Sequence, residues 1–186
     1  MTVGTSLEDA AGKPPTVSEP LAAGNFQTGR VTNADLLEIR VPIRLSSPNA
    51  TRGHHWSRRH AETNTWELLI PAYAPAGHGS WSLVASATLT QDRRGRRRVK
   101  LQRIRECRRV TVTRLVPSSR NFIRDEENLR FSTKPVNDAL KRLGFLYDDS
   151  RRWLEQPLPR EEVAPDGRDV TVIQIERVTD VERTGE

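Results

Sequence analysis

A nearly continuous β-branched run near the C-terminus, DVTVIQIERV at 169–178, is the feature that most restricts the fold. Such a run is typical of a strand buried on both faces, so it predicts the central strand of a sheet. The alternating segment LLEIRVPIRL at 36–45 predicts a half-buried strand. Its Pro42 cannot donate a hydrogen bond to a neighbour, so this strand is expected at a sheet edge or with a bulge.

Further elements are predicted between these two segments. A helix is expected over 56–69, because the Pro and Gly residues of PAYAPAGHGS at 71–80 end it. VTVTRLV at 110–116 predicts another strand. The basic segment before that strand has two interpretations. Either WSLVASATLT and RRVKLQRI form a hairpin around the turn QDRRGR, or RRRVKLQRIRECRR at 96–109 forms a basic helix.

One apolar stripe predicts a second helix. The apolar positions spaced i, i+3, i+4 and i+7 are Val136, Ala139, Leu140 and Leu143. The signals that delimit the helix are Ser132 or Thr133 as a cap, Pro135 in the first turn and Gly144 at the end. The order of elements predicts an α+β fold with a mixed β-sheet and helices packed on one face.

Composition divides the chain into one domain with two tails. Residues 1–33 are rich in Gly, Ala, Ser, Thr and Pro without apolar periodicity, which predicts a disordered N-terminal arm. The folded domain is expected over 34–180, with a basic insert at about 80–109, and 181–186 are expected to be a disordered tail.

The formal net charge of +6 and the pI of about 10.2 favour a polyanionic partner, of which nucleic acid is the commonest. The alternative is a basic protein that binds nothing specific. The single cysteine, Cys107, excludes an internal disulfide and suits a reducing, cytoplasmic compartment. No apolar run approaches the roughly 20 residues that span a bilayer, and no secretory signal is expected, so membrane roles are not favoured.

Two acidic clusters flank the predicted second helix. Asp125 and Glu127 precede it, and Asp148 and Asp149 follow its Gly turn. In an extended chain Asp125 and Glu127 would point the same way, and GFLYDD is long enough to return the second cluster to the helix start. Converging carboxylates form the all-oxygen site that Mg²⁺ prefers, and Mg²⁺ beside a phosphodiester is the usual requirement of a metal-dependent nuclease.

Lys134 fits the same site. It lies at the predicted helix start, where the helix dipole disfavours a cation by a few tenths to about 1 kcal/mol. A lysine there gains little structurally, whereas beside a phosphate it would stabilise developing negative charge. The alternatives are that the first acidic cluster favours a helix N-terminus and that the second is a solvated turn.

These residues resemble the RusA family of Holliday junction resolvases. The family pattern is D-x-D-N-L, a lysine often followed by proline, then D-A-L, a glycine turn and D-D. Here DEENL, KP, DAL and GFLYDDS supply its parts between 125 and 150, and SPNATRGHHW is loosely similar to the segment after the family's first strand. The resemblance implies a RusA-like fold and a homodimer that uses Mg²⁺ to nick opposed strands of a four-way DNA junction.

The resemblance also implies residue roles. Asp125 and Glu127 match the first two metal-ligand aspartates, Lys134 the catalytic lysine, and Asp149 the third ligand, with Asp148 as its neighbour. Glu127 stands where the family has an aspartate, and the spacing from the family's asparagine to Lys134 is longer than in the best-known member.

The basic insert is expected to contact DNA phosphates rather than read sequence. The candidate residues are Arg94, Arg96, Arg97, Arg98 and Lys100. The alternative is a solvated face that serves solubility. A zinc site at His54, His55 and His60 is not favoured because the spacing matches no standard zinc pattern. Trp56 is expected in the core rather than stacked on a base.

The sequence as a whole predicts a Mg²⁺-dependent, structure-selective endonuclease that resolves Holliday junctions or other branched DNA by paired nicks. The alternative from another class is a non-catalytic junction-binding or regulatory protein that retains the fold. A third possibility shares the metal chemistry and differs in substrate, acting on flaps or single strands.

Overall fold

The computed structural model describes residues 31–33, 35–46, 56–92 and 94–178. Most of the expected N-terminal arm and all of the expected tail at 181–186 therefore lie outside the described residues. Val31–Asn33, which the sequence places in the arm, form the short strand β1.

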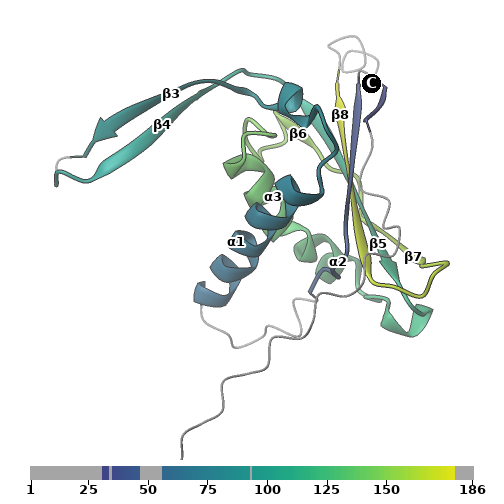
Figure 1. Cartoon of the computed structure of the whole chain (residues 1–186). Coiled ribbons are helices and arrows are strands. Elements are labelled where there is room, and N and C mark those ends of the chain that lie inside the picture. The colour runs from purple at the N-terminus through teal and green to yellow at the C-terminus, as the bar shows by residue number, and fades with distance from the viewer. Residues whose placement is uncertain (1–30, 34, 47–55, 93, 179–186) are drawn as a thin grey trace, which may run out of the picture.

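A mixed six-stranded sheet organises the domain (Figure 1). Its strands are, in spatial order, β1, β2 (Leu36–Val41), β8 (Val170–Arg177), β5 (Arg108–Val116) and β6 (Leu154–Glu155), with β7 (Arg160–Val163) also paired to β5. The strand β8 is antiparallel to both β2 and β5, whereas β6 and β7 run parallel to β5. The prediction that 169–178 contain a central strand is confirmed.

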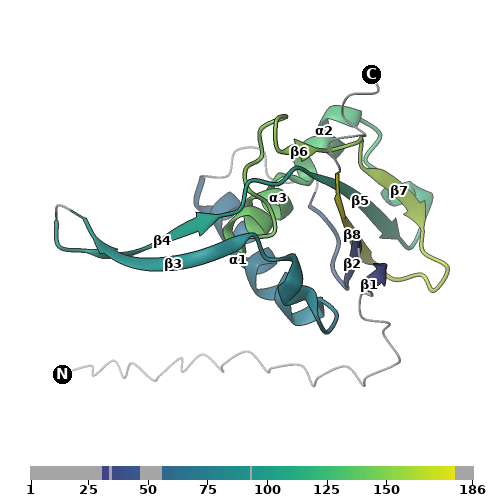
Figure 2. The ribbon, with the colours of Figure 1, turned by 90° about the horizontal axis from the view of Figure 1, so that it is seen from above.

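The register of these strands aligns apolar side chains in rows on one face. Ile39, Ile173 and Val112 are direct neighbours across β2, β8 and β5, and all three are buried. Helices α1 (Trp56–Tyr73) and α3 (Lys134–Arg142) lie side by side against this face (Figures 1 and 2). The structure confirms an α+β fold with a mixed sheet and helices on one face.

Several expected boundaries change. The strand β2 ends at Val41 instead of continuing to Leu45, because Pro42 has no N–H to continue the ladder, and β2 lies between β1 and β8 rather than at an edge. The helix α1 continues through Pro71 to Tyr73, because a proline in the last turn removes only one helical hydrogen bond.

Short elements escape the sequence patterns. The elements that the sequence did not predict are the strands β1, β6 and β7, the helix α2 (Glu126–Ser132) and the 3₁₀ turns η2 (His78–Trp81) and η3 (Ser119–Asn121). Each is too short to show a hydrophobic period.

The basic insert forms a hairpin that projects away from the sheet and helices (Figures 1 and 2). Its strands are β3 (Val84–Gln91) and β4 (Arg97–Arg103), so the hairpin prediction is confirmed and the helix alternative is wrong. The turn is stabilised by the Asp92 carboxylate, whose Oδ1 accepts hydrogen bonds from the backbone N–H groups of Arg94 and Arg96 at 2.9 and 3.0 Å.

Gly144 ends α3 as expected and connects it to the hairpin. Its φ of 84° is left-handed, and the Phe145 N–H donates to the Leu140 carbonyl at 2.9 Å, which is the pattern of a glycine helix stop. The Gly144 carbonyl accepts a 2.7 Å hydrogen bond from the Leu83 N–H. A Cβ on Gly144 would lie 2.5 Å from Cγ2 of Val84.

We therefore predict that Gly144→Ala destabilises the domain by about 2–4 kcal/mol, from backbone strain together with the clash against Val84. The matched control is Gly167→Ala, because Gly167 also has a positive φ but has open space around its Cβ position. Thermal unfolding should show the larger loss for Gly144→Ala. Equal losses would contradict the packing role of Gly144.

Candidate functional site

The first acidic cluster begins helix α2. The Asp125 side chain caps the helix, since its Oδ1 accepts a hydrogen bond from the Asn128 N–H at 3.0 Å, and Glu126 and Glu127 form the first turn. The expectation that Asp125 and Glu127 point the same way along an extended chain is wrong, because Glu127 is already helical. The alternative interpretation of this cluster, a helix N-terminus, describes the local structure.

The second acidic cluster returns alongside α3. Lys141 Nζ lies 2.8 Å from Asp148 Oδ1 and 2.8 Å from Asp149 Oδ1. Lys134 Nζ lies 3.6 Å from the other oxygen of Asp149 and 3.4 Å from Asp138 Oδ1. Asp149 is therefore held between the first and last turns of one helix, beside the predicted catalytic lysine.

Two members of this charged cluster, Lys141 and Asp138, were not among the predicted site residues. Their signal is present in the sequence, because 134, 138 and 141 are spaced i, i+4 and i+7 and share one helix face. The apolar residues of α3 occupy the opposite, buried face. The sequence therefore contains a charged stripe as well as the apolar stripe that predicted the helix.

The lysine contacts shift the pKa values of the second cluster. Hydrogen bonds from Lys141 are the main cause that lowers the pKa of Asp148, with Ser150 adding to it, and the main cause that lowers the pKa of Asp149. In turn, the two carboxylates raise the pKa of Lys141. At neutral pH the cluster therefore holds ionised carboxylates next to ammonium groups.

A three-carboxylate centre is not assembled in the described part of the chain. Among those residues, no three Asp, Glu, His or Cys side chains converge in a way that could hold a metal ion. The structure brings Asp149 to Lys134, but it does not gather Asp125 and Glu127 into the same group. One oxygen of Asp148 and one of Asp149 are instead paired with Lys141.

The predicted DNA-contacting residues all lie on the projecting hairpin, and their side chains are exposed. They are Arg94 and Arg96 in the turn and Arg97, Arg98 and Lys100 on β4. Arg98 contacts Asp92 at 3.4 Å, a weak surface pair that leaves its guanidinium largely exposed.

A surface hollow of about 680 Å³ connects the base of this hairpin to the charged cluster. It is lined by Leu101, Gln102, Arg103, Arg105, Lys141, Tyr147 and Asp148. Arg103 donates to the Tyr147 carbonyl at 3.4 Å, and Arg105 donates to the Tyr147 hydroxyl at 3.3 Å. The base of the basic ribbon and Asp148 of the acidic pair therefore border the same hollow.

Not every arginine of the insert is available to a partner. Arg108 is buried and donates to the carbonyls of Trp81 and Phe145 at 2.6 and 3.1 Å. Burial lowers its pKa, an effect that Glu106 opposes through an ion pair and a hydrogen bond. Arg109 pairs with Glu155 and Glu176 on the sheet.

The remaining candidates play no part in the charged cluster. His54 and His55 lie outside the described residues, as does the side chain of Trp56, and His60 contacts Arg142 at 3.3 Å. The side chain of Cys107 is buried.

None of the described helices is long and apolar enough to cross a membrane. No protein-family model matches the chain, and no curated protein sequence matches it.

We predict that Lys141→Met raises the pKa of Asp148 and Asp149, since it removes the main cause that lowers them. Lowered carboxyl pKa values add stability that is present above the ordinary value of 3.8 and lost as the pH falls below it. The raised pKa of Lys141 adds stability that is present below 10.5 and lost as the pH rises through the folded value.

The free energy of unfolding of native protein and variant should therefore differ most between about pH 5 and 9, by up to roughly 1 kcal/mol for such partly exposed groups. The difference should shrink below about pH 4. Carboxyl NMR titration measures the pKa values, and urea unfolding over the same pH range measures the stability. Unchanged titration of both carboxyls in the variant would show that Lys141 does not control them.

Proposed function

We propose that the protein is a Mg²⁺-dependent endonuclease that nicks Holliday junctions or related branched DNA in the cytoplasm. The observation that carries the proposal is a charged cluster in which Lys134 contacts Asp149 and Lys141 contacts both aspartates. Two members of this cluster, Lys141 and Asp148, line a hollow that also reaches the base of the basic hairpin. A phosphodiester bound along the ribbon and this hollow would reach a lysine and two carboxylates together.

The donor set suits Mg²⁺ more than any softer metal, because all of its ligand atoms would be carboxylate oxygens. Proteins commonly hold Mg²⁺ with one or two carboxylates, several waters and substrate phosphates, so Asp148 and Asp149 supply enough protein ligands once DNA is bound. The resemblance to the RusA family would add Asp125 and Glu127, which lie at the start of α2 and are not gathered with Asp149 in the described residues. When bound, the ion would polarise the phosphate and lower the pKa of a water.

The chain's own residues then have distinct tasks. Lys134 lies at the exposed start of α3, where its ammonium group can donate to the scissile phosphate and stabilise the charge that develops there. Lys141 holds the Asp148 and Asp149 carboxylates together before the substrate arrives, at 2.8 Å from an oxygen of each. The hairpin arginines hold the DNA arms through phosphate contacts.

A homodimer forms part of this proposal, because paired nicks on a four-way junction require two sites in one complex. The motif between 125 and 150 supports membership of a RusA-like group, although Glu127 adds a methylene to one ligand arm. Light scattering of the protein alone and bound to a junction tests the stoichiometry.

One observation favours a second candidate function, a non-catalytic junction-binding protein. In the described residues Lys141 occupies both carboxylates of the second cluster, and no three-ligand group is assembled. Such a protein would bind the junction through the same hairpin without turnover. A Mg²⁺ titration of the cleavage rate separates the two functions, since only the enzyme depends on the metal.

We predict that Asp149→Asn abolishes Mg²⁺-dependent cleavage of a labelled four-way junction while binding is equal or tighter, because a negative charge near the phosphate is removed.

Lys134→Ala should slow cleavage by on the order of 10²- to 10³-fold with binding nearly intact, as for loss of one electrostatic donor. Ca²⁺ should support binding by the native protein with little turnover.

The matched control is Asp166→Asn, since Asp166 is an exposed loop aspartate whose Oδ1 accepts from the Arg168 N–H. Linear, flap and single-stranded DNAs run in parallel define the substrate, and thermal melts exclude misfolding. Paired symmetric nicks on the junction are the expected product. Normal cleavage by a folded Asp149→Asn protein would eliminate this site as the catalytic centre.

A second prediction concerns the hairpin. Replacing Arg96, Arg97 and Arg98 with Ala should weaken binding to all duplex forms and reduce the slope of log affinity against log salt by roughly 0.9 for each phosphate that is no longer neutralised. The control variant replaces three exposed arginines elsewhere, at 130, 160 and 168, so its net charge is the same. Equal slopes for the two variants would mean that the hairpin charge serves solubility alone.

A further inference from the structure

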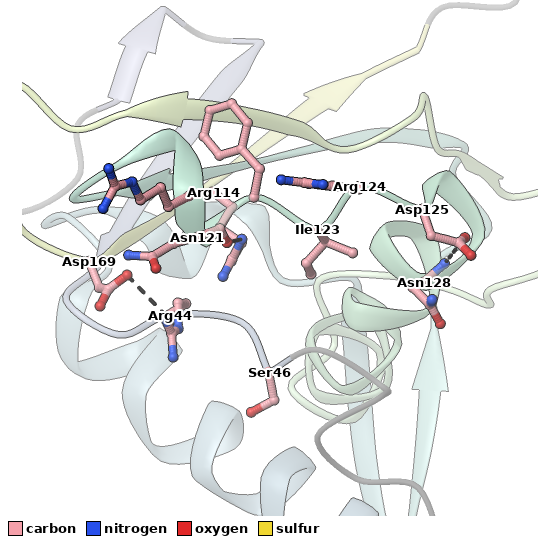
Figure 3. A pocket seen from close by; sticks show the side chains of 11 residues that line it. Arg44, Ser46, Arg114, Asn121, Ile123, Arg124, Asp125, Asn128 and Asp169 are labelled. Carbon is pink, nitrogen blue, oxygen red and sulfur yellow. Dashed lines mark hydrogen bonds and ion pairs between the residues drawn. The ribbon is translucent and has the colours of Figure 1, made fainter.

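A second hollow, of about 690 Å³, lies between the chain that follows β2 and the segment that joins β5 to α2. Figure 3 shows Arg44 and Asp169 at one end of it and Asp125 and Asn128 at the other. It therefore extends from the end of the sheet to the first turn of α2, where it reaches the first acidic cluster.

The floor of this pocket is a buried arginine. On β5 the inward-facing positions are Arg108, Val110, Val112, Arg114 and Val116, so Arg114 takes the place of an apolar residue near the far end of the strand. Its side chain is only 3% exposed, and its Nη1 donates to the Asn121 carbonyl at 2.8 Å and to the Glu161 carboxylate. Within the described part of the chain, its buried Nε has no hydrogen-bond partner.

The Arg114–Glu161 pair also fixes the loop that forms the pocket wall. Glu161 Oε2 accepts a hydrogen bond from the Ile123 N–H at 2.8 Å, so the segment between β5 and α2 is held against β7. This segment leads directly to Asp125. The pocket is therefore shaped by buried interactions rather than by surface side chains alone.

The charge of the lining favours an anion. Four arginines and two aspartates line the pocket. Arg44 lies a loose 4.0 Å from Asp169, and neither Arg120 nor Arg124 has an ion-pair partner among the described residues. Because guanidinium groups match the geometry of phosphate oxygens, unpaired arginines around a hollow suit a phosphate.

The aromatic side chain of Phe122 lines the same pocket. Aromatic rings beside arginines are the usual means by which proteins bind unpaired bases, since the ring stacks on the base while the cations hold the backbone. Two of the lining arginines, Arg120 and Arg124, are exposed, so the pocket suits a strand that passes through it more than an enclosed free nucleotide.

We propose that this pocket binds one nucleotide of an unpaired DNA strand, with its phosphate on Arg44, Arg120 and Arg124 and its base against Phe122. This inference rests on the proposed function, because it names the part of the branched substrate that contacts this face. The pocket holds the strand beside Asp125 and so determines which segment of the junction lies next to the first acidic cluster.

The test measures fluorescence anisotropy of a short labelled oligothymidylate in EDTA, so that cleavage plays no part. Arg120→Gln combined with Arg124→Gln should weaken binding roughly tenfold and lower the salt slope by about 0.7, the value for one phosphate of a single strand. The control combines Arg160→Gln with Arg168→Gln, which removes two exposed arginines that do not line the pocket. Equal binding by the two double variants would overturn the proposal.

Phe122→Leu tests the base contact. It should weaken binding of oligothymidylate roughly tenfold and leave binding of an abasic strand of equal length unchanged, as expected when one base is no longer stacked. The comparison is made within one variant, so a change in folding cannot produce it. Equal weakening for both strands would overturn the base contact. If thymidine monophosphate competed as strongly as the oligonucleotide, the proposal that the pocket binds a strand would be wrong. The pocket would then be a site for a free nucleotide.

These outcomes are independent of catalysis. Junction cleavage by native protein, together with pocket variants that bind like their control, would overturn this inference and leave the proposed nuclease intact. Binding through the pocket without any Mg²⁺-dependent cleavage would support this inference and overturn the proposed nuclease.

Discussion

The buried guanidinium of Arg108 joins three parts of the chain that are distant in sequence. It lies at the start of β5, bonds to the carbonyls of Trp81 and Phe145, and stacks over the Trp81 ring at 5.3 Å. A buried charge is costly unless its donors are satisfied, so these carbonyls must remain in place. The entry to the hairpin and the turn that leads from α3 to Asp148 are thereby fixed to the same strand.

The basic and the acidic side chains lie in separate parts of this arrangement. The hairpin carries its arginines away from the sheet, whereas α3 and the returning chain gather Asp148, Asp149, Lys134 and Lys141 into a nearly balanced cluster. A basic ribbon alone would attract any polyanion. The carboxylates near its base add oxygen ligands that could hold a divalent cation next to a bound phosphodiester.

The two arginines on the inward face of β5 show where sequence patterns were incomplete. VTVTRLV predicted the strand correctly, and its alternation already placed Arg114 among buried valines. An arginine on an apolar face signals a buried partner or a pocket, yet the partner, Glu161, lies on a strand too short to predict. Likewise, the charged face of α3 was readable from the spacing of Lys134, Asp138 and Lys141, but its attachment to Asp149 depended on the path of the returning chain.

The sequence by itself determined the central strand at 169–178, the helix that Gly144 ends and the α+β class, because hydrophobic period and turn chemistry are local properties. It left the basic segment open between a hairpin and a helix, and the structure shows the hairpin. Only the tertiary structure decided which charges meet. It paired Lys141 with both aspartates, began a helix at Asp125 where an extended segment was expected, and buried Arg108 within a stretch that the sequence assigned to DNA contact. The physical reason is that an ion pair depends on distance in space, and that distance is set by packing between segments far apart in the chain.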